Sequence, residues 1–453
     1  MKKILLISYH FPPSAEVGGL RIANFTKYLL LFGWNTYVLT IMDHYLKKVD
    51  TERFKDVETM NIFKTEQLPS IRQTYLGLKK IYFRILKRQS IPLDESENHY
   101  FRPNFKVVGK ENISQKLKRY LISFITRPDL ETNWILPAVL KAIREIRRKK
   151  IGYILTSCPP YSVHIIGLLV KRITGVKWIA DFRDPWMTTV PRGLYVTCSL
   201  IDKIEYWLER KVIEQTDAVL TNTEALCHAF KNLYKKQPVN KFLYIPNGYN
   251  PEFFSKFKDF RKYKRFTLTY TGSFYLSRTP EPVFKALKEL MMEGKLNAED
   301  IRVNLVGNCQ HVNGCPTSQI INTYGLGQTV HVLGQVSHHK ALNIIKRSHL
   351  ALLLAENQPF QIPAKVYDYI GLGTTILALT EEGATRDLIN GSLVAGASFY
   401  PSDIDGIKKF ILEEINKVDS MIHGSNVNRL SEFDSKVVTQ KLDNDLKILM
   451  MRP

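Results

Sequence analysis

The chain has 453 residues, of which 44% are apolar and 24% charged, an ordinary composition for a soluble globular protein. This length exceeds what one hydrophobic core usually supports, so two domains are expected. No run of 18 or more uninterrupted apolar residues occurs, which argues against a membrane-spanning helix. Five scattered cysteines, an odd number, indicate reduced thiols in the cytoplasm.

Positive charge is concentrated in one part of the chain. The net charge is +21, from 64 basic and 43 acidic residues, and residues 71–150 hold 19 Lys and Arg against 7 Asp and Glu. Such a surface favours an anionic partner. No helix-turn-helix, zinc or ribonucleoprotein signature accompanies the charge, so nucleic acid is not expected as that partner.

Residues 71–88 predict a basic amphipathic helix, with apolar and aromatic side chains near one face and Lys and Arg around the others. A helix of this kind can lie on anionic lipid headgroups. There each basic residue contributes roughly 1 kcal/mol to attachment. The alternative is a helix whose apolar face packs in the hydrophobic core and whose basic face is exposed to solvent. Residues 112–125 and 144–150 repeat the pattern more weakly.

Short apolar runs alternate with helical stretches in the first half of the chain, which predicts a parallel sheet covered by helices. The first run is too short for a signal peptide and is interpreted as a buried strand. The expected strands span 4–8, 35–40, 153–157, 177–181 and 218–222. Neither GxGxxG nor a Walker A motif occurs, which disfavours a dinucleotide or ATP fold.

Two adjacent glycines, Gly18 and Gly19, follow the first strand and precede an amphipathic helix. Paired glycines let the backbone approach a ligand closely and expose the N–H groups of the next turn. Ligands of open parallel sheets bind at the carboxyl ends of the strands, so this turn is a candidate site. A plain tight turn is the alternative.

A second candidate site follows the strand at 177–181. The sequence ADFRDPW places Asp181, Arg183 and Asp184 at the carboxyl end of that strand. The preceding segment SCPPYSVH, which ends at His164, leads toward the same edge of the sheet. Buried ion pairs are the alternative explanation for these charged residues.

Residues 245–265 combine Pro, Gly and Asn with dense charge, a composition typical of a linker. Beyond them the alternation resumes, with expected strands at 267–270, 302–306, 330–333, 350–354 and 375–379. The first of these leads into TGSFYLSRTP, a glycine and a small polar residue before a helix opened by Pro280. Arg278 in this loop can bind a diphosphate through two parallel hydrogen bonds, and an exposed arginine is the alternative.

The segment IPAKVYDYIGLG, residues 362–373, places a proline and a lysine before a short acidic helix and a glycine break. The first N–H groups of a helix lack partners and attract anions. Lys365 would add a full charge there. Asp368, three residues later on the same helical face, could reach a ribose. The alternative is an exposed Lys–Asp pair above a buried apolar face.

Taken together, these motifs resemble those of a known family. YHFPPSAEVGG, DFRDPW, IPNGYN, YTGSF and IPAKVYDYIGLG are similar to motifs of the family 4 glycosyltransferases with the GT-B fold, especially bacterial members that serve surface-polysaccharide assembly. The resemblance covers nearly the whole chain, with the motifs in the right order. Each motif alone is moderately specific, and the combination is strong.

The resemblance implies an α/β, GT-B architecture of two Rossmann-like domains facing across a cleft. Residues 1–249 would bind the acceptor and carry a basic insertion at about 71–150. A linker at 250–265, a nucleotide-sugar-binding domain at 266–430 and a C-terminal helix at 431–453 would follow. The resemblance also implies a retaining transferase without an essential metal or cofactor, and the expected donor is a nucleotide sugar, with a UDP-sugar preferred.

We expect the site to be formed by residues of these motifs. The expected catalytic residues are Arg278, Lys365 and Asp184. The donor would be bound by Gly272, Ser273, Pro363, Asp368, Glu382 and Gly383. The acceptor side would be formed by Gly18, Gly19, His164, Asp181 and Arg183.

The chain departs from the family pattern at one point. The family's two glutamates, eight residues apart, map to Phe360 and Asp368, so the first is missing and the second is shortened. The first glutamate contacts the donor sugar in the family, which leaves the sugar and even catalysis open, and Lys365 is a candidate substitute. The alternatives are therefore a noncatalytic saccharide-binding relative and a nucleotide-sugar epimerase of similar fold.

No metal site is expected. Cys309, His311 and Cys315 lack a further ligand for a tetrahedral set, and the D-x-D strings at 403–405 and 443–445 fall in helical segments where we expect them to face solvent. The basic first half favours a saccharide or lipid-diphosphate-linked acceptor and a peripheral location at the inner face of the cytoplasmic membrane.

Overall fold

The computed structural model consists of two compact units, which are described one at a time. Unit 1 comprises Met1–Asn222, Leu226–Ile245 and Thr439–Pro453, and unit 2 comprises Thr223–Ala225 and Pro246–Val438. The structure describes residues 2–16, 18–50, 59–69, 127–187, 199–257, 261–274, 278–391, 394–420 and 430–450. The predicted basic helix at 71–88 and its repeat at 112–125 lie outside these ranges. No helix within them has the length and apolar character needed to cross a membrane.

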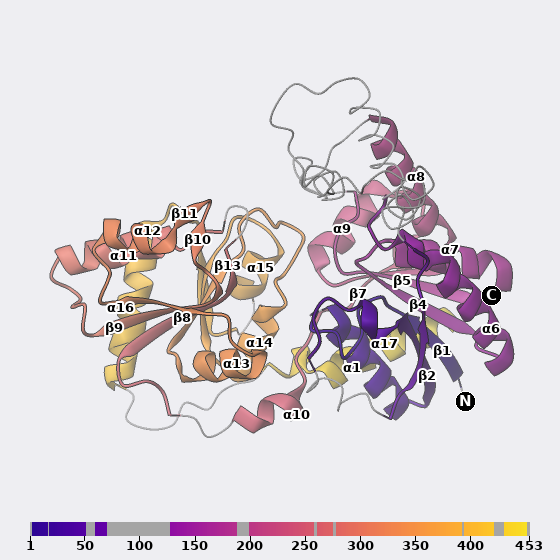
Figure 1. Ribbon diagram of the computed structural model, residues 1–453, viewed down its shortest axis with the longest axis horizontal. Helices are drawn as coiled ribbons and strands as arrows, with labels where there is room; N and C mark the ends of the chain where they lie inside the picture. Colours follow the sequence, from indigo (N-terminus) through magenta and orange to yellow (C-terminus); the bar gives the residue numbers. More distant parts are fainter. Residues whose placement is uncertain are drawn as a thin grey trace, which may run out of the picture. The chain divides into compact units, whose positions relative to one another are not determined.

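Unit 1 is built on a sheet that has seven strands in the described part of the chain, all of them parallel to their neighbours (Figure 1). The strands are β1 (Lys2–Ile7), β2 (Trp34–Ile41), β3 (Asn61–Thr65), β4 (Tyr153–Cys158), β5 (Lys177–Phe182), β6 (Ala218–Thr221) and β7 (Phe242–Tyr244), in the order β3-β2-β1-β4-β5-β6-β7. The five strands predicted in this half are confirmed. The sequence does not predict β3 and β7, because both are short strands at the edges of the sheet.

Helices cover both faces of this sheet. They are α1 (Gly18–Leu31), α6 (Ile135–Lys149), α7 (Ser162–Thr174), α8 (Ser199–Gln215), α9 (Glu224–Leu233) and α17 (Ser435–Met450). A connection between two parallel strands is right-handed, so the direction in which it moves along the sheet determines which face of the sheet its helix covers. The helices α6, α7 and α8 connect strands in one direction and share a face, whereas α1 connects β1 to β2 in the opposite direction and covers the other face.

One prediction about the C-terminal helix α17, that its D-x-D string faces solvent, is partly wrong. Trp34, at the start of β2, donates from Nε1 to Oδ1 of Asp443 over 2.8 Å, and Asp443 is only 1% exposed. The prediction that this D-x-D string faces solvent is therefore wrong for Asp443, because an indole N–H satisfies the carboxylate inside unit 1. Asp403 and Asp405 are exposed, as predicted.

Unit 2 is built on a parallel sheet with six strands in the described residues. The strands are β8 (Phe266–Ser273), β9 (Ile301–Asn308), β12 (Val330–Gly334), β13 (Leu350–Leu354), β14 (Thr375–Leu379) and β15 (Gly396–Phe399), in the order β12-β9-β8-β13-β14-β15. A separate two-stranded hairpin consists of β10 (His311–Val312) and β11 (Cys315–Pro316). The five predicted strands are confirmed, and β15 is missed because its sequence, GASF, has little strand propensity.

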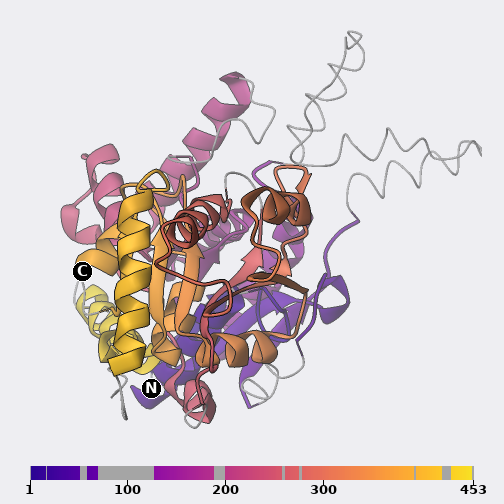
Figure 2. The same ribbon diagram turned by 90° about the vertical axis from the view of Figure 1, so that its left-hand side faces the viewer.

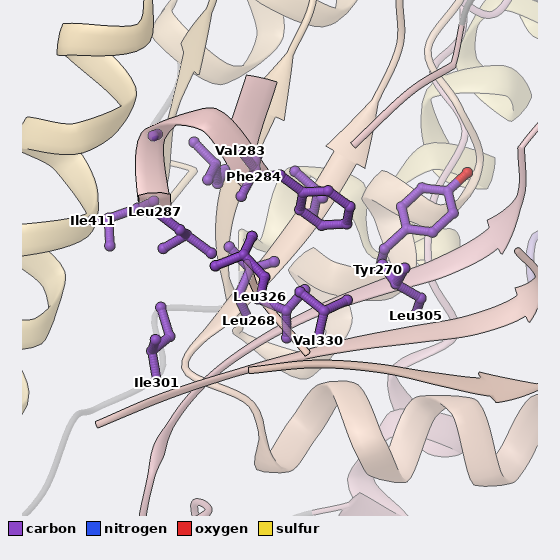
Figure 3. Close-up of a cluster of buried hydrophobic side chains, with 14 of the residues drawn as sticks. Leu268, Tyr270, Val283, Phe284, Leu287, Ile301, Leu305, Leu326, Val330 and Ile411 are labelled. Atoms are coloured by element: carbon purple, nitrogen blue, oxygen red, sulfur yellow. The ribbon is translucent and has the colours of Figure 1, made fainter. Parts of the chain in front are cut away.

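The sheet of unit 2 separates two hydrophobic cores, because successive side chains of a strand point to opposite faces. Its helices are α11 (Glu281–Met292), α12 (Thr317–Tyr324), α13 (His338–Arg347), α14 (Lys365–Leu372), α15 (Ala384–Gly391) and α16 (Ile404–Ser420). From β13, Leu350, Leu352 and Leu354 join a core with α11, α12 and α16, shown in Figure 3, whereas Ala351 and Leu353 join a core with α13, α14 and α15. Figure 2 shows α16, in gold, beside the orange strands of this sheet, and Ile407 and Ile411 of α16 belong to the first of these cores.

The predicted linker at 250–265 contains a short helix, α10 (Pro251–Phe254). The side chain of Asn250 caps it by accepting a hydrogen bond from the N–H of Glu252 over 3.0 Å. Phe254 and Phe257 then pack into the core that α13, α14 and α15 share. The first part of this segment is therefore anchored to unit 2 by two aromatic side chains.

Candidate functional site

The carboxyl end of β8 in unit 2 holds Lys365 against the main chain. Nζ of Lys365 donates to the carbonyl oxygen of Thr271 over 2.8 Å and lies 4.3 Å from the ring centre of Tyr270. The hydroxyl of Tyr270 donates to the carbonyl oxygen of Ser273 over 3.0 Å, and the hydroxyl of Tyr369 lies 3.0 Å from Oγ1 of Thr271. These contacts fix the amino group of Lys365 at the end of an interior strand.

A second basic side chain, Arg278, influences Lys365. Arg278 is 8% exposed and lies between β8 and α11. Burial and, next, the charge of Arg278 lower the pKa of Lys365 to about 7, while Cys309 and Asp368 act in the opposite direction. Two positive charges that are largely shielded from water repel each other strongly. An anion bound near both of them would relieve this repulsion and be stabilised by both.

Two glycines allow this close packing. Gly272 has a φ of +141°, and a Cβ there would lie 2.9 Å from Nζ of Lys365. Its partner in β9, Gly307, has a φ of +117°, and a Cβ there would lie 2.0 Å from the carbonyl oxygen of Gly272. Behind them, Sγ of Cys309 donates to the same carbonyl oxygen over 3.5 Å, and burial raises the pKa of this thiol to about 12. Larger side chains at either glycine would displace the strand end or Lys365.

The helix α14 begins at Lys365, two residues after Pro363. The carbonyl oxygen of Pro363 accepts a hydrogen bond from the N–H of Val366 over 2.9 Å. Asp368, one turn inside, has Oδ2 3.4 Å from Nε2 of His338, and both side chains are partly exposed. Lys365 and Asp368 therefore face different partners, and the positive end of the helix dipole lies beside Lys365.

Glu382 and Gly383 lie just before α15. The carboxylate of Glu382 contacts the hydroxyl of Tyr400 and lies 3.5 Å from Nε of Arg386. Gly383 has a φ of +141°, and a Cβ there would lie 2.5 Å from Cα of Pro359. Gly383 thus allows the loops after β13 and β14 to touch, while Glu382 is exposed and held by local partners.

In unit 1, Asp181 is the centre of a buried polar network. It has no exposed surface, and its carboxylate accepts from Nη2 and Nε of Arg21 over 3.0 and 3.1 Å. Oγ of Ser157 donates to the same carboxylate over 2.7 Å, and Nη2 of Arg21 also donates to the carbonyl oxygen of Ile245 over 2.8 Å. The network ties α1 to β4, β5 and the residue after β7, so Asp181 acts here as a structural ion-pair partner.

Arg183 lies against the start of α1. Its Nε donates to the carbonyl oxygen of Cys158 over 2.6 Å. A Cβ at Gly18 would lie 2.0 Å from Nη1 of Arg183, and a Cβ at Gly19 would lie 3.1 Å from the carbonyl oxygen of His10. The glycine pair therefore makes room for a guanidinium group and for the loop after β1.

His164 and Asp184 differ in exposure. His164, in α7, is completely buried, with Nδ1 2.8 Å from Oγ1 of Thr156 and its ring 4.3 Å from that of Phe182. Burial lowers the pKa of His164 to about 3, so this ring is neutral at physiological pH. Asp184 is partly exposed just beyond β5. Asp184 thus has surface to offer a ligand, and His164 has none.

Cys309, His311 and Cys315 lie on or beside the hairpin of β10 and β11. Their sulfur atoms have separate partners, since Sγ of Cys309 faces the carbonyl oxygen of Gly272 and Sγ of Cys315 lies 3.6 Å from Oε1 of Gln319. Among the residues that the structure describes, no three His, Cys, Asp or Glu side chains are grouped so as to hold a metal ion.

The sequence analysis did not identify several residues that form the candidate sites in the two units. Arg21 has a detectable signal, because it occupies the same helical face as Phe25 and Leu29, and an arginine on an apolar stripe indicates a buried partner. Thr271 and Gly307 have no such signal, because they contribute through the backbone. Gly272, Ser273 and Lys365 are brought together at the end of β8, where the charge of Arg278 also acts on Lys365, whereas Glu382 and Gly383 lie in a separate loop.

No family model matches the chain, and no curated protein matches it. Solved structures do match. A glycosyltransferase from Rickettsia africae aligns over 100% of both chains with a TM-score of 0.58 and 10% identity. Alr3699/HepE from Anabaena, in complex with UDP and glucose, aligns over 99% of this chain and 100% of that chain, with a TM-score of 0.60 and 12% identity. A trehalose-6-phosphate protein from E. coli, bound with UDP-2-fluoro glucose, aligns over 100% of both chains with a TM-score of 0.56 and 12% identity.

These matches define the fold of the chain. Identities of 10 to 12% establish the fold alone, and the alignments span both α/β units. Together with the two parallel sheets, they confirm the architecture that the motifs predicted. The chain has the GT-B fold of glycosyltransferases.

Proposed function

We propose that the chain is a retaining glycosyltransferase that moves a sugar from a nucleotide sugar to a saccharide or lipid-linked saccharide in cell-surface polysaccharide biosynthesis. The observation that carries this proposal is the position of Lys365, whose Nζ donates to the carbonyl oxygen of Thr271 over 2.8 Å at the carboxyl end of β8, with the charge of Arg278 acting on it. Parallel sheets bind ligands at that end. Solved structures of similar fold contain UDP or a UDP-sugar analogue, which supports a UDP-sugar as the donor.

The expected chemistry follows from charge. A departing nucleoside diphosphate gains negative charge in the transition state, and fixed positive groups stabilise it. Arg278, Lys365 and the N–H groups at the start of α14 would supply that stabilisation without a metal or a cofactor. Asp368 would bind the ribose in exchange for its contact with His338, and Asp184 would act from the acceptor side.

We expect the purified chain to be stabilised by UDP-sugars and to release UDP from them. A ligand present at 100 times its dissociation constant stabilises the folded state by roughly 2.7 kcal/mol. Melting temperature and nucleotide release would be measured with UDP-, GDP- and dTDP-sugars, with and without a saccharide acceptor. EDTA is expected to leave the release unchanged.

Three other outcomes would contradict this function in different ways. Stabilisation without release or transfer would identify a noncatalytic binding protein. Interconversion of one nucleotide sugar into its epimer, without nucleotide release, would identify an epimerase. The absence of any response to all three nucleotides would remove the assignment of Arg278 and Lys365 to a diphosphate.

We further propose that unit 1 binds peripherally to the anionic inner face of the cytoplasmic membrane. Support comes from α6, where Leu136, Leu140, Arg144 and Arg147 follow one another at spacings of four, four and three and are all exposed. Leu136 and Leu140 are 55% and 61% exposed. One helical face thus combines aliphatic side chains that can enter the headgroup region with arginines that attract anionic lipids.

In a flotation experiment, the chain is expected to float with vesicles that contain anionic phospholipid and to stay behind with neutral vesicles. The Arg144→Glu, Arg147→Glu double variant should lose most of this recovery, because each basic residue contributes about 1 kcal/mol near an anionic surface. Lys409→Glu, at an exposed lysine of α16, is the matched control and should behave like the wild type. Equal recovery with both vesicle types would contradict the proposal.

A further inference from the structure

The segment 183–187 follows β5 at the carboxyl end of the sheet in unit 1, and other elements fix its main chain. The guanidinium group of Arg183 donates to two carbonyl oxygens at the end of β4 and just beyond it, over 2.6 and 2.7 Å. The hydroxyl of Tyr161 donates to the carbonyl oxygen of Pro185 over 2.8 Å. Asp184, which lies between these two contacts, is partly exposed.

The last two residues of the segment are fixed as well. The indole ring of Trp186 is 1% exposed and stacks on the ring of Tyr161, with the ring centres 5.1 Å apart. The N–H of Met187 donates to Oε2 of Glu209 over 2.7 Å. Asp184 is therefore a partly exposed carboxylate in a segment that is fixed on both sides of it.

Glu209 makes the last of these contacts from α8. Its side chain is completely buried, and Oε1 accepts a hydrogen bond from the hydroxyl of Tyr234, just beyond α9. No ion pair joins Glu209 to a Lys or Arg within the described ranges. Burial raises the pKa of Glu209 to about 7, and its two hydrogen bonds act in the opposite direction. Because burying a carboxyl group without a cation does not favour folding, stability alone does not explain this residue.

Glu205 provides a comparison on the same helix, one turn before Glu209. It is also buried, but its Oε2 accepts from Nη1 of Arg127 over 2.9 Å, so its charge is paired. No hydrogen bond or ion pair in the described part of the chain joins Glu205 to residues 183–187. Of these two buried glutamates, Glu209 is thus the one that fixes the segment beside Asp184.

We propose that Glu209, held by Tyr234, is a positioning residue that fixes the main chain at Met187 and thereby the place of Asp184. Glu209 itself contacts neither donor nor acceptor. This inference rests on the proposed glycosyltransferase function, in which Asp184 acts from the acceptor side. A misplacement of about 1 Å can lower a rate about 100-fold, so losing this contact should affect turnover more than donor binding in unit 2.

The contact can be tested without turnover by fluorine NMR on the full chain labelled with fluorotryptophan. The resonance of Trp186 is assigned from its loss in Trp186→Phe, and the stacked ring of Tyr161 makes it sensitive to small movements. In Glu209→Ala, we expect this resonance to shift or broaden. The resonance of Trp178, a buried residue of β5, should stay as in the wild type.

Two further variants separate the contact from a general loss of stability. Glu209→Gln should keep the wild-type resonance of Trp186, because an amide can accept from the N–H of Met187 and donate to Tyr234. Glu205→Ala is the matched control, since it removes a buried glutamate from the same helix. It should lower the melting temperature and leave the Trp186 resonance in place.

Turnover then tests whether Glu209 acts through Asp184. Glu209→Ala should lower kcat about tenfold or more and change KM for the nucleotide sugar less than about twofold, whereas Glu209→Gln should keep most of the wild-type kcat. Asp184→Asn should also lower kcat. Adding Glu209→Ala to Asp184→Asn should cause little further loss, because the effects of residues that act as a unit are not additive.

An unchanged Trp186 resonance in Glu209→Ala would overturn the inference. Independent losses of kcat that multiply in the double variant, or equal losses of kcat in Glu209→Ala and Glu205→Ala, would also overturn it. If the wild type transfers no sugar but Glu209→Ala alone moves the resonance, the proposed transferase function fails, and Glu209 still stands as the residue that positions 183–187.

Discussion

Replacing Asp181 with alanine is expected to lower the free energy of unfolding by about 3–5 kcal/mol, because it leaves the charge of Arg21 buried without its carboxylate. Arg21 would lose two hydrogen bonds, at 3.0 and 3.1 Å, and Ser157 would lose its acceptor. Urea unfolding followed by circular dichroism measures the change. A shift of this size would establish that the ion pair of Asp181 with Arg21 stabilises unit 1.

Two further variants separate this effect from the general cost of removing a carboxylate. Asp43→Ala is the matched control, because Asp43 pairs with Lys64 over 2.6 Å at the surface, where ion pairs contribute about 0–1 kcal/mol. The Arg21→Met, Asp181→Leu double variant should recover most of the stability, since it leaves no unpaired charge. An Asp181→Ala protein that unfolds like Asp43→Ala would show that the network contributes little.

The interior strands of both sheets could be predicted because they are continuous apolar runs. In β13, all five residues are buried and alternate between two cores, which is the pattern of a parallel strand covered on both faces. The edge strand β15 was missed because pairing with β14, not its own composition, makes it a strand. Asp443 was misjudged because its partner, Trp34, lies 409 residues away in the sequence.

The sequence predicted which residues lie at the candidate site, but it predicted few of the contacts that these residues make. The motifs placed Gly272 at the end of a strand, Arg278 in the loop that follows and Lys365 near the start of a helix, where the structure also has them. The sequence could not reveal that Lys365 turns to the carbonyl oxygen of Thr271 while Asp368, on the same short helix, faces His338. Such partners come from other elements of the fold, and no local pattern encodes them.

Lys365→Met is expected to lower turnover by about 10–100-fold, because a charge-assisted contact to a leaving diphosphate contributes about 1.5–3 kcal/mol. The same substitution should change the pH dependence of binding. The pKa of Lys365 is about 7 in the free protein, and a bound diphosphate would raise it. Above pH 7 binding must therefore take up a proton, and affinity should fall as pH rises, by at most about tenfold per pH unit.

Calorimetry with UDP-glucose, in buffers of different ionisation enthalpy, measures this proton uptake directly. UDP-glucose is the better probe because its diphosphate is esterified at both ends and does not itself titrate near pH 7. Lys346→Met is the matched control, since Lys346 is a buried lysine that likewise donates to a main-chain carbonyl oxygen, that of Leu372 over 2.8 Å, at the other end of α14. Lys346→Met should keep the proton uptake, and Lys365→Met should lose it. If Lys365→Met binds UDP-glucose with unchanged pH dependence, the diphosphate lies elsewhere and the charge of Lys365 serves only the packing at the end of β8.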